Sequence, residues 1–379
     1  MRQALTRCWR SWRDLRRFSA SPPEHRKIVF YSEGTGYWRY FRGVIQELLA
    51  ASSLTISYVT SDPADPLLET TKPRLATYYI GRGSAMAAFF QSVEARVVVM
   101  TMPDLETFHI KRSRTVGQYV YLHHSIVSTH MVYRKAAFDH FDSILCVGPH
   151  HVEETREWEA AFGLPQKQLV PHGYGLLDDM MASPPPAPAN RERKTILVAP
   201  SWGREGLLES YGLPLCRCLL DSGHRVVVRP HPRSVQLAPH LIPDLQRVLG
   251  RDKDFVIDSD REGWHSLVEA DVMISDWSGV AFEYAFGLLR PVVFVDTPRK
   301  VNNPEYERLH AVPFEVQARE KVGRIVVPGR WDEMGEAVSL ALSDGAGKQD
   351  ELLRQREKSI FNVGTSASAA TGYLLQLAR

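Results

Sequence analysis

Two prolines hold an arginine and a histidine close together in the segment Arg229-Pro230-His231-Pro232. This segment ends a β-branched run, Arg225–Arg229, that is typical of a buried strand. A guanidinium offers a planar fork to phosphate oxygens, and an imidazole exchanges protons near neutral pH. Because proline fixes φ, the loop should keep both side chains in set directions. We therefore expect Arg229 and His231 to act on a phosphate group. An ordinary polar turn is the alternative.

A second candidate anion site is the turn Asp276-Trp277-Ser278-Gly279, between a strand at Val272–Ser275 and an apolar helix at Val280–Leu288. Free N–H groups and the dipole at a helix start favour an anion, whereas a plain N-cap is the alternative. Glu283 lies within this helix, which is apolar nearly all round and therefore predicted to be buried. A buried carboxylate is costly unless it is paired, so we expect Glu283 to bind ligand hydroxyls or an arginine.

Tandem histidines, His123-His124, follow the predicted strand Gln118–Leu122 and precede Ser125. A histidine at a strand end is well placed for proton transfer, although a polar loop cap is the alternative. Successive strand residues point to opposite faces, so at most one of the pair should face a ligand. Another loop, after the strand Lys27–Tyr31, contains Gly34 and Gly36, where the backbone could approach a ligand closely.

Short β-branched runs alternate with helical patterns along most of the chain, which is typical of parallel βαβ units. The remaining predicted strands are Thr55–Val59, Arg96–Met100, Ser143–Val147, Gln168–Val170, Thr195–Ala199, Asp254–Ile257 and Pro291–Val295. The proline-rich segment 183–193 interrupts this alternation and predicts a stiff linker. The sequence therefore predicts an α/β fold with two facing Rossmann-like domains, 27–182 and 194–365, and a C-terminal helix at 366–379. Ligands should bind in the interdomain cleft, beyond the carboxyl ends of the strands.

The N-terminal segment 1–20 predicts a basic amphipathic helix. Its first 18 residues contain one acid, Asp14, and six arginines: Arg2, Arg7, Arg10, Arg13, Arg16 and Arg17. Apolar residues recur at helical spacing and form one stripe: Leu5, Trp9, Trp12 and Leu15. Such a helix suits the surface of an anionic membrane, and a helix packed on the protein body is the alternative. No run of about 18 apolar residues predicts a membrane span.

Composition narrows the class of protein further. The 379 residues are 44% hydrophobic and 24% charged, as in globular proteins, and the net charge of +2 gives no overall drive toward nucleic acid. The 4 cysteines lack the spacing of a disulfide framework, which fits a reducing cytoplasm. Cys216 and Cys218 have no second pair, so we expect no metal site.

The order of these motifs from residue 118 to 298 resembles the CDP-glycerol glycerophosphotransferases, enzymes that make teichoic acids, capsules and other surface polymers. This resemblance implies the GT-B fold. It places His124 at the position of the family's proposed base, within a motif that is Trp-His-Gly in the family. It also places Arg229 and His231 in a group implicated in catalysis and in holding the donor diphosphate. Where the family has Asp-Tyr-Ser-Ser, this chain has Asp276-Trp277-Ser278-Gly279.

The remaining site assignments follow the two predicted domains. The donor side is assigned Ser201, Asp276, Ser278, Gly279 and Glu283. The acceptor side is assigned Gly34, Gly36 and His123.

The expected reaction is transfer of glycerol phosphate, or a related polyol phosphate, from a CDP-activated donor to a hydroxyl of a lipid-linked or polymeric glycan. CMP would leave, and no cofactor, metal or nucleic-acid partner is expected. The expected location is cytoplasmic, on the inner face of the membrane through residues 1–18. Two alternatives remain: a GT-B glycosyltransferase that uses a nucleotide sugar, and a non-catalytic glycan-binding subunit. Nucleotide preference and CMP release would distinguish the three.

Overall fold

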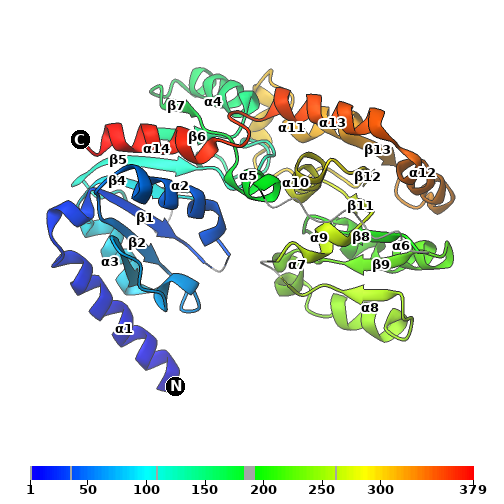
Figure 1. Ribbon diagram of the computed structural model, residues 1–379, viewed down its shortest axis with the longest axis horizontal. Helices are drawn as coiled ribbons and strands as arrows, with labels where there is room; N and C mark the ends of the chain where they lie inside the picture. Colours follow the sequence, from blue (N-terminus) through cyan, green and yellow to red (C-terminus); the bar gives the residue numbers. More distant parts are fainter. Residues whose placement is uncertain (1, 35, 108–109, 183–192, 261–262) are drawn as a thin grey trace.

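The computed structural model describes the chain except for residues 1, 35, 108–109, 183–192 and 261–262. The chain forms two parallel β-sheets, each packed with helices and lying side by side (Figure 1). We refer to the sheet with the lower residue numbers and its helices as the first lobe, and to the other as the second lobe. The predicted linker, 183–193, lies outside the described residues except for Arg193.

The first sheet has the strand order β3-β2-β1-β4-β5-β6-β7, and every neighbouring pair is parallel. Its strands are β1 (Ile28–Ser32), β2 (Ile56–Thr60), β3 (Leu75–Tyr79), β4 (Ala95–Met100), β5 (Val116–Leu122), β6 (Ser143–Cys146) and β7 (Gln168–Pro171). The chain runs outward from β1 to β3 and then places β4 on the other side of β1. This reversal is a topological switch point, beyond which ligands bind in such sheets. The glycine loop after β1 and the histidine loop after β5 both leave this carboxyl edge.

The second sheet repeats the arrangement with the order β10-β9-β8-β11-β12-β13, again all parallel. Its strands are β8 (Thr195–Val198), β9 (Arg225–Val228), β10 (Phe255–Ile257), β11 (Val272–Ser275), β12 (Val292–Val295) and β13 (Gly323–Val326). Here the reversal falls between β8 and β11. The loops that carry Ser201, His231 and Ser278 therefore share one edge of the sheet.

The helices pack on both lobes. Those of the first lobe are α1 (Arg2–Ser19), α2 (Trp38–Ala51), α3 (Ser84–Ser92), α4 (Pro149–Phe162), α5 (Gly175–Ala182) and α14 (Ser366–Leu377). Those of the second are α6 (Leu207–Asp221), α7 (Pro232–Leu237), α8 (Leu241–Leu249), α9 (His265–Glu269), α10 (Gly279–Leu288), α11 (Phe314–Val322), α12 (Trp331–Ser343) and α13 (Ala346–Ser359). Short 3-10 turns lie at Pro23–Arg26, Pro66–Leu68 and Pro304–Arg308. Among the described residues, no helix is both long and apolar enough to cross a membrane.

The chain crosses back to the first lobe at its C-terminal end. Phe361 N donates a hydrogen bond to Val147 O at 2.8 Å, and α14 then packs against α2 (Figure 1). The carboxylate of Asp178, on α5, accepts hydrogen bonds from the amides of Gly364 and Ser366. The predicted C-terminal helix thus covers the first sheet, although its sequence follows the second.

One apolar core is continuous between the lobes. It joins α10 of the second lobe to α5 of the first, with Phe282, Tyr284 and Phe286 fully buried in it. Helix α10 is apolar on nearly every side, and its burial on both faces accounts for that composition. The contact fixes the position of α10, and with it that of Glu283, relative to the first lobe.

The predicted strands agree with the observed ones to within two residues at each end. Two edge strands were not predicted. β3 and β13 are short and contain residues that do not alternate in polarity, and β13 begins with Gly323-Arg324. Edge strands have one neighbour, so their sequences are under weaker constraint than those of central strands.

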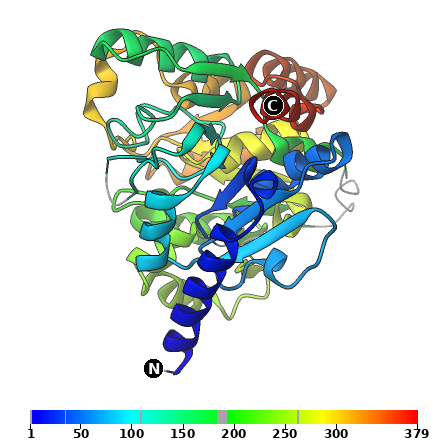
Figure 2. The same cartoon turned by 90° about the vertical axis from the view of Figure 1, so that its left-hand side faces the viewer.

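Helix α1 packs on the protein body through its C-terminal part. Leu15 and Phe18 are buried, with the Phe18 ring against Tyr78 (5.3 Å between centroids) and Phe89 (5.4 Å). Asp14 is also buried and accepts a hydrogen bond from Tyr79 N, on the edge strand β3. The N-terminal half projects from the body (Figure 2). There Trp9 and Trp12 remain 65% and 38% exposed, so the predicted single stripe is divided between the protein and its surface.

Alanine substitutions in the two halves of α1 should therefore change the free energy of unfolding by different amounts. Phe18→Ala should lower the free energy of unfolding by about 3–5 kcal/mol, because it empties a buried aromatic position. Trp9→Ala should change it by less than about 0.5 kcal/mol, as expected for an exposed side chain. Urea unfolding of the two variants checks this, and equal effects would contradict the packing of α1.

Candidate active site

His124 leaves the carboxyl end of β5 inside a cage of tyrosines. The hydroxyl of Tyr121 lies 3.3 Å from its Nδ1, and the hydroxyl of Tyr133 lies 3.4 Å from its Nε2. The rings of Tyr37 and Tyr40 pack against the imidazole at 5.5 and 5.7 Å between centroids. The cage therefore places a hydroxyl group near each ring nitrogen of His124.

The surroundings keep this imidazole neutral. Burial lowers the pKa of His124 to about 4, and the positive charge of Arg39 lowers it further, against a hydrogen bond with the backbone of Thr101 that raises it. A neutral imidazole always has one nitrogen with a free lone pair. His124 is therefore in the protonation state that a general base needs at neutral pH.

His123 points the other way, as the two-residue period of a strand requires. It is 2% exposed, and its ring lies 3.9 Å from that of His151 between centroids. Burial and the neighbouring histidines place its pKa well below the usual range. The predicted acceptor-side position of His123 is therefore corrected: it lies in a buried histidine cluster. Two members of that cluster, His150 and His151, contact the carbonyls of Ile126 and Val127 and so fix the loop that follows His124.

Asp276 organises the switch point of the second sheet. It is fully buried, and its carboxylate accepts hydrogen bonds from the amides of Ser201 (2.7 Å), Trp277 (2.7 Å) and Leu207 (3.2 Å). These bonds join the end of β11 to the loop after β8 and to the start of α6. Because its oxygens are occupied by backbone amides, Asp276 serves here as a positioning residue for the loops around it.

The start of α10 meets the loop after His124. Ser278 is the N-cap of α10, but its side chain makes no capping hydrogen bond. The amide of Ala281 donates to the carbonyl of Ser278 at 3.2 Å, whereas the amides of Gly279 and Val280 precede this bond and can serve an anion together with the Ser278 hydroxyl. A Cβ added to Gly279 would lie 2.9 Å from the Oγ of Ser125. The absence of a side chain at Gly279 thus lets the two lobes approach at this point.

A hydrogen-bonded bridge crosses between the lobes beside this contact. The hydroxyl of Tyr174, in the first lobe, lies 2.6 Å from Oε1 of Glu283 and 3.2 Å from the carbonyl oxygen of His124. Arg39 lies in the same group: it donates to the hydroxyl of Tyr40 at 2.8 Å, and the charge of Glu283 helps to raise its pKa. The carboxylate that the sequence left without a partner is therefore held by a tyrosine and faces an arginine.

The guanidinium of Arg229 already has hydrogen-bond partners within the protein, which the sequence did not predict. Its Nη1 lies within hydrogen-bonding distance of Asp258 Oδ2 (3.3 Å), Gly263 O (2.8 Å) and Ser266 Oγ (3.1 Å). Burial lowers the pKa of Arg229, and Arg39 lowers it further across the lobes. Arg229 therefore anchors the loop after β10 and at the same time contributes positive charge to the junction of the lobes.

His231 has a defined role in hydrogen bonding. Its Nδ1 accepts a hydrogen bond from the amide of Arg233 at 3.1 Å, which assigns the proton of the neutral ring to Nε2. Burial lowers the pKa of His231 to about 3, and the charges of Lys300 and Arg233 lower it further. His231 is thus a neutral donor through Nε2–H, suited to an anionic oxygen and not to accepting a proton there.

The loop after β1 lies on the same carboxyl edge as His124. A side chain at Gly34 would collide with Arg82, whose Nη2 lies 2.6 Å from the position of an added Cβ. Gly36 has φ of 82°, a conformation that favours glycine. Glu33 lies between the end of β1 and Gly34, and its burial raises the pKa of its carboxyl group to about 7. The loop therefore brings a backbone turn and a partly protonated carboxyl group toward the tyrosine cage.

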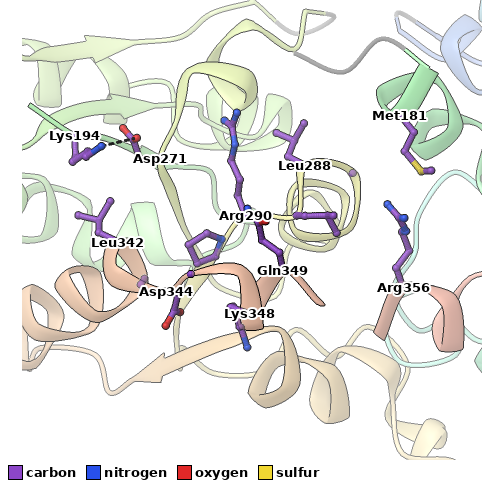
Figure 3. Close-up of a pocket in the computed structure, with 15 residues that line it drawn as sticks. Met181, Lys194, Asp271, Leu288, Arg290, Leu342, Asp344, Lys348, Gln349 and Arg356 are labelled. Atoms are coloured by element: carbon purple, nitrogen blue, oxygen red, sulfur yellow. Dashed lines mark ion pairs between the residues drawn. The ribbon is translucent and has the colours of Figure 1, made fainter. Parts of the chain in front are cut away.

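A cavity of about 590 Å³ in the second lobe is separate from this site (Figure 3). Its lining includes Lys194, Asp271 and Pro291, which immediately precede β8, β11 and β12. The cavity therefore lies at the amino ends of the strands, opposite the switch point. Two of its arginines, Arg290 and Arg356, already donate to backbone carbonyls.

Several site residues have no signal in the sequence. Arg39 reaches the site from a helix without any recognisable motif. Tyr174 lies in the turn Gly173-Tyr174-Gly175 after the predicted strand Gln168–Val170, a turn that could line the cleft but is more often an ordinary one. Trp202 follows Ser201, and only its place after a strand could have indicated it. Among the described residues, no group of three or more histidine, cysteine, aspartate or glutamate side chains is arranged to hold a metal ion.

The two parallel α/β lobes, with ligand loops of both sheets meeting at one junction, define a GT-B transferase fold. The CDP-glycerol:poly(glycerophosphate) glycerophosphotransferase family model matches residues 16–298. The chain belongs to this family and is a transferase that uses CDP-glycerol. The match includes the loops of His124, Arg229, His231 and Ser278.

Solved structures show the same fold at low sequence identity. The wall teichoic acid polymerase TagF has a TM-score of 0.59 and 15% identity, covering 100% of this chain and 97% of that one. The UDP-GlcNAc 2-epimerase of Methanocaldococcus jannaschii, solved with UDP-GlcNAc and UDP, has a TM-score of 0.57 and 14% identity, covering 92% and 99%. A putative UDP-N-acetylglucosamine 2-epimerase from Listeria monocytogenes has a TM-score of 0.59 and 13% identity, covering 90% and 94%. No curated protein sequence matches the chain.

The bridge between the lobes can be tested by removing one hydroxyl. Tyr174→Phe should lower the free energy of unfolding by about 1–3 kcal/mol, because it leaves Glu283 without its donor. It should also reduce CMP release from CDP-glycerol. The matched control is Tyr284→Phe, which removes a buried hydroxyl bonded to Ala270 O within the second lobe. The control should lower the free energy of unfolding by a similar amount and leave the rate of CMP release unchanged. Equal rates of CMP release in the two variants would contradict a role for the bridge.

Proposed function

We propose that this enzyme transfers glycerol phosphate from CDP-glycerol to a hydroxyl of a surface-polymer or lipid-linked glycan acceptor and releases CMP. The second lobe binds the donor, and the first lobe presents the acceptor. The observation that carries the proposal is the junction itself: a neutral imidazole at His124 lies beside the start of α10, and Tyr174 joins the two.

In the proposed reaction, an acceptor hydroxyl oxygen attacks the distal phosphorus of the donor. The new P–O bond forms as the bond from that phosphorus to the bridging oxygen breaks, and the electron pair leaves with CMP. The proton of the hydroxyl passes to the unprotonated nitrogen of His124, where the acceptor hydroxyl takes the place of a tyrosine hydroxyl. This is proton transfer by a base whose pKa lies below the working pH, combined with the positioning on which phosphoryl transfer depends.

Charge on the transferring group is met by donors of the second lobe. His231 offers Nε2–H, and the first amides of α10 and the hydroxyl of Ser278 offer further donors. Arg229 and Arg39 add positive charge from the two sides of the junction. Glu283, held by Tyr174, faces this group and suits a hydroxyl of the donor.

We further propose that the acceptor approaches along the loop after β1 and the tyrosine cage. The turn at Gly36 leaves room for backbone contacts, because nothing lies within 4 Å of a Cβ added there, and Glu33 and Tyr37 offer a carboxyl and a hydroxyl group. Such groups form hydrogen bonds with the hydroxyls of polyols and sugars. This gives the first lobe the chemistry of an acceptor site.

Helix α1 is proposed to hold the enzyme at the inner face of an anionic membrane. Trp9 and Trp12 are exposed, and Arg7, Arg13 and Arg16 are exposed on the same projecting helix (Figure 2). Indole rings favour the interfacial region, and arginines are attracted to anionic headgroups. Membrane attachment would bring the enzyme to a lipid-linked acceptor.

Replacing the proposed base tests the mechanism. His124→Ala should reduce the rate of CMP release from CDP-glycerol by about 10²–10⁴-fold, the usual contribution of a general base, and the protein should stay folded. His240→Ala, at an exposed histidine, is the control. In the wild type, kcat/KM should fall as the pH decreases through about 4, because protonation removes the lone pair. Near-normal turnover in His124→Ala, or CMP release absent from the wild type while a UDP-sugar is turned over, would contradict the proposal.

The membrane proposal is tested with vesicles. The double variant Trp9→Ala/Trp12→Ala should co-sediment less with vesicles of phosphatidylglycerol and phosphatidylcholine than the wild type does. Leu237→Ala, which removes another exposed apolar side chain at 63% exposure, should bind as the wild type. Sedimentation of the double variant at the wild-type level would refute attachment through α1.

A further inference from the structure

Two cations of the second lobe share one indole ring. Nζ of Lys300 lies 3.4 Å from the centroid of the Trp202 ring, and Cζ of Arg233 lies 4.0 Å from it. The two charges are therefore at most 3.4 + 4.0 = 7.4 Å apart. Within the described parts of the chain, neither side chain has an ion-pair partner within 4.0 Å. Like charges this close and partly desolvated repel each other, so the arrangement favours binding of an anion.

The two carboxylates whose charges act on Lys300 accept hydrogen bonds from other groups. Asp276 accepts three backbone amides, as described above. Glu209 accepts from the hydroxyl of Ser234 at 2.6 Å and from the amide of Gly203. The remaining charged neighbour is Arg233, and His231 presents a neutral Nε2–H beside it. Among the described residues, neither carboxylate lies within 4.0 Å of the Lys300 ammonium or the Arg233 guanidinium, so both cations and the Nε2–H of His231 keep hydrogen-bond donors available to an anion.

This group lies on the edge of the sheet where the donor is proposed to bind. Trp202 is in the loop after β8, Arg233 begins α7 next to His231, and Lys300 is in the segment after β12. That segment continues to the first lobe, where Asn302 N donates to Met131 O at 3.0 Å and Asn303 Nδ2 donates to His130 O at 3.0 Å. Lys300 is thus held between the lobes. It lies beyond residue 298, where the family match ends.

We propose that Lys300 and Arg233 form a binding subsite for the diphosphate of the nucleotide donor, with Trp202 holding both cations in place before the donor arrives. The subsite rests on the proposed function, since it takes the same donor. It adds two charged ligands to the uncharged donors at His231 and Ser278. Lysine and arginine provide charge-assisted hydrogen bonds to phosphate oxygens, which are stronger than those from neutral groups.

The protonation state of Lys300 gives the subsite a second measurable property, the uptake of protons when the donor binds. Burial lowers the pKa of Lys300 to about 7; Arg233 lowers it, while Asp276 and Glu209 oppose the shift. At pH 8 the free side chain is therefore mostly neutral, and a bound diphosphate must raise its pKa. Donor binding at pH 8 should then take up protons from the buffer. CDP-glycerol is a suitable probe because its diphosphate is a diester and has no ionisation of its own near this pH.

The test is calorimetric titration of the full chain with CDP-glycerol. Lys300→Gln should weaken binding by about tenfold or more, the usual effect of losing a hydrogen bond to a charged group. Arg299→Gln, at the exposed neighbouring position, should bind within about twofold of the wild type. Lys300→Arg should retain most of the affinity. At pH 8 the wild type should take up protons on binding, measured in two buffers of different ionisation enthalpy, and Lys300→Gln should not.

Inorganic pyrophosphate separates failure of the subsite from failure of the proposed function. If Lys300→Gln binds both CDP-glycerol and pyrophosphate as tightly as Arg299→Gln does, the subsite is wrong, whatever the enzyme transfers. If the wild type binds pyrophosphate through Lys300 but does not bind CDP-glycerol, the subsite stands and the donor assignment fails. Thermal unfolding of each variant at the wild-type temperature excludes misfolding as the cause of a loss.

Discussion

The hydroxyl of Tyr174 makes the hydrogen bonds on which the rest of the site depends. Its single proton is shared between the carboxylate of Glu283, at 2.6 Å, and the carbonyl of His124, at 3.2 Å, and this contact fixes the strand end of one sheet against the helix of the other. The apolar core around α10 and α5 excludes water from this contact and strengthens it. A loosely hinged pair of lobes would leave the proposed base and the proposed anion site free to separate.

Buried polar residues fix the loops of the candidate site, and other polar residues there keep hydrogen-bond donors available. Asp276 and His151 have no exposed surface, and both hold backbone segments: one the loops of the second switch point, the other the loop after His124. His231 is half-buried and keeps its Nε2–H available, and the buried Ser278 keeps a hydroxyl that makes no capping hydrogen bond. The neutral state of both His124 and His231 follows from burial, yet their roles differ, because Nδ1 of His231 already accepts a backbone amide.

The sequence predicted the sheets and the loops that carry the site because strand periodicity and strand ends are local properties. It could state that only one of His123 and His124 faces the ligand, but not which one, since that depends on the face that the helices cover. Arg39 and Lys300 reach the site from distant segments, and nothing in their local sequence indicates it. The linker prediction at 183–193 falls outside the described residues apart from Arg193.

The central claim is that the loop of His124 and the start of α10 touch across the lobes. The most direct measurement is disulfide formation in Ser125→Cys/Gly279→Cys, made with Cys8→Ser to remove the exposed native thiol. An added Cβ at Gly279 lies 2.9 Å from Ser125 Oγ, so mild oxidation should yield a 125–279 linked peptide by mass spectrometry. Ser125→Cys/Gly335→Cys should yield none. Two free thiols at 125 and 279 in the oxidised, folded protein would contradict the account.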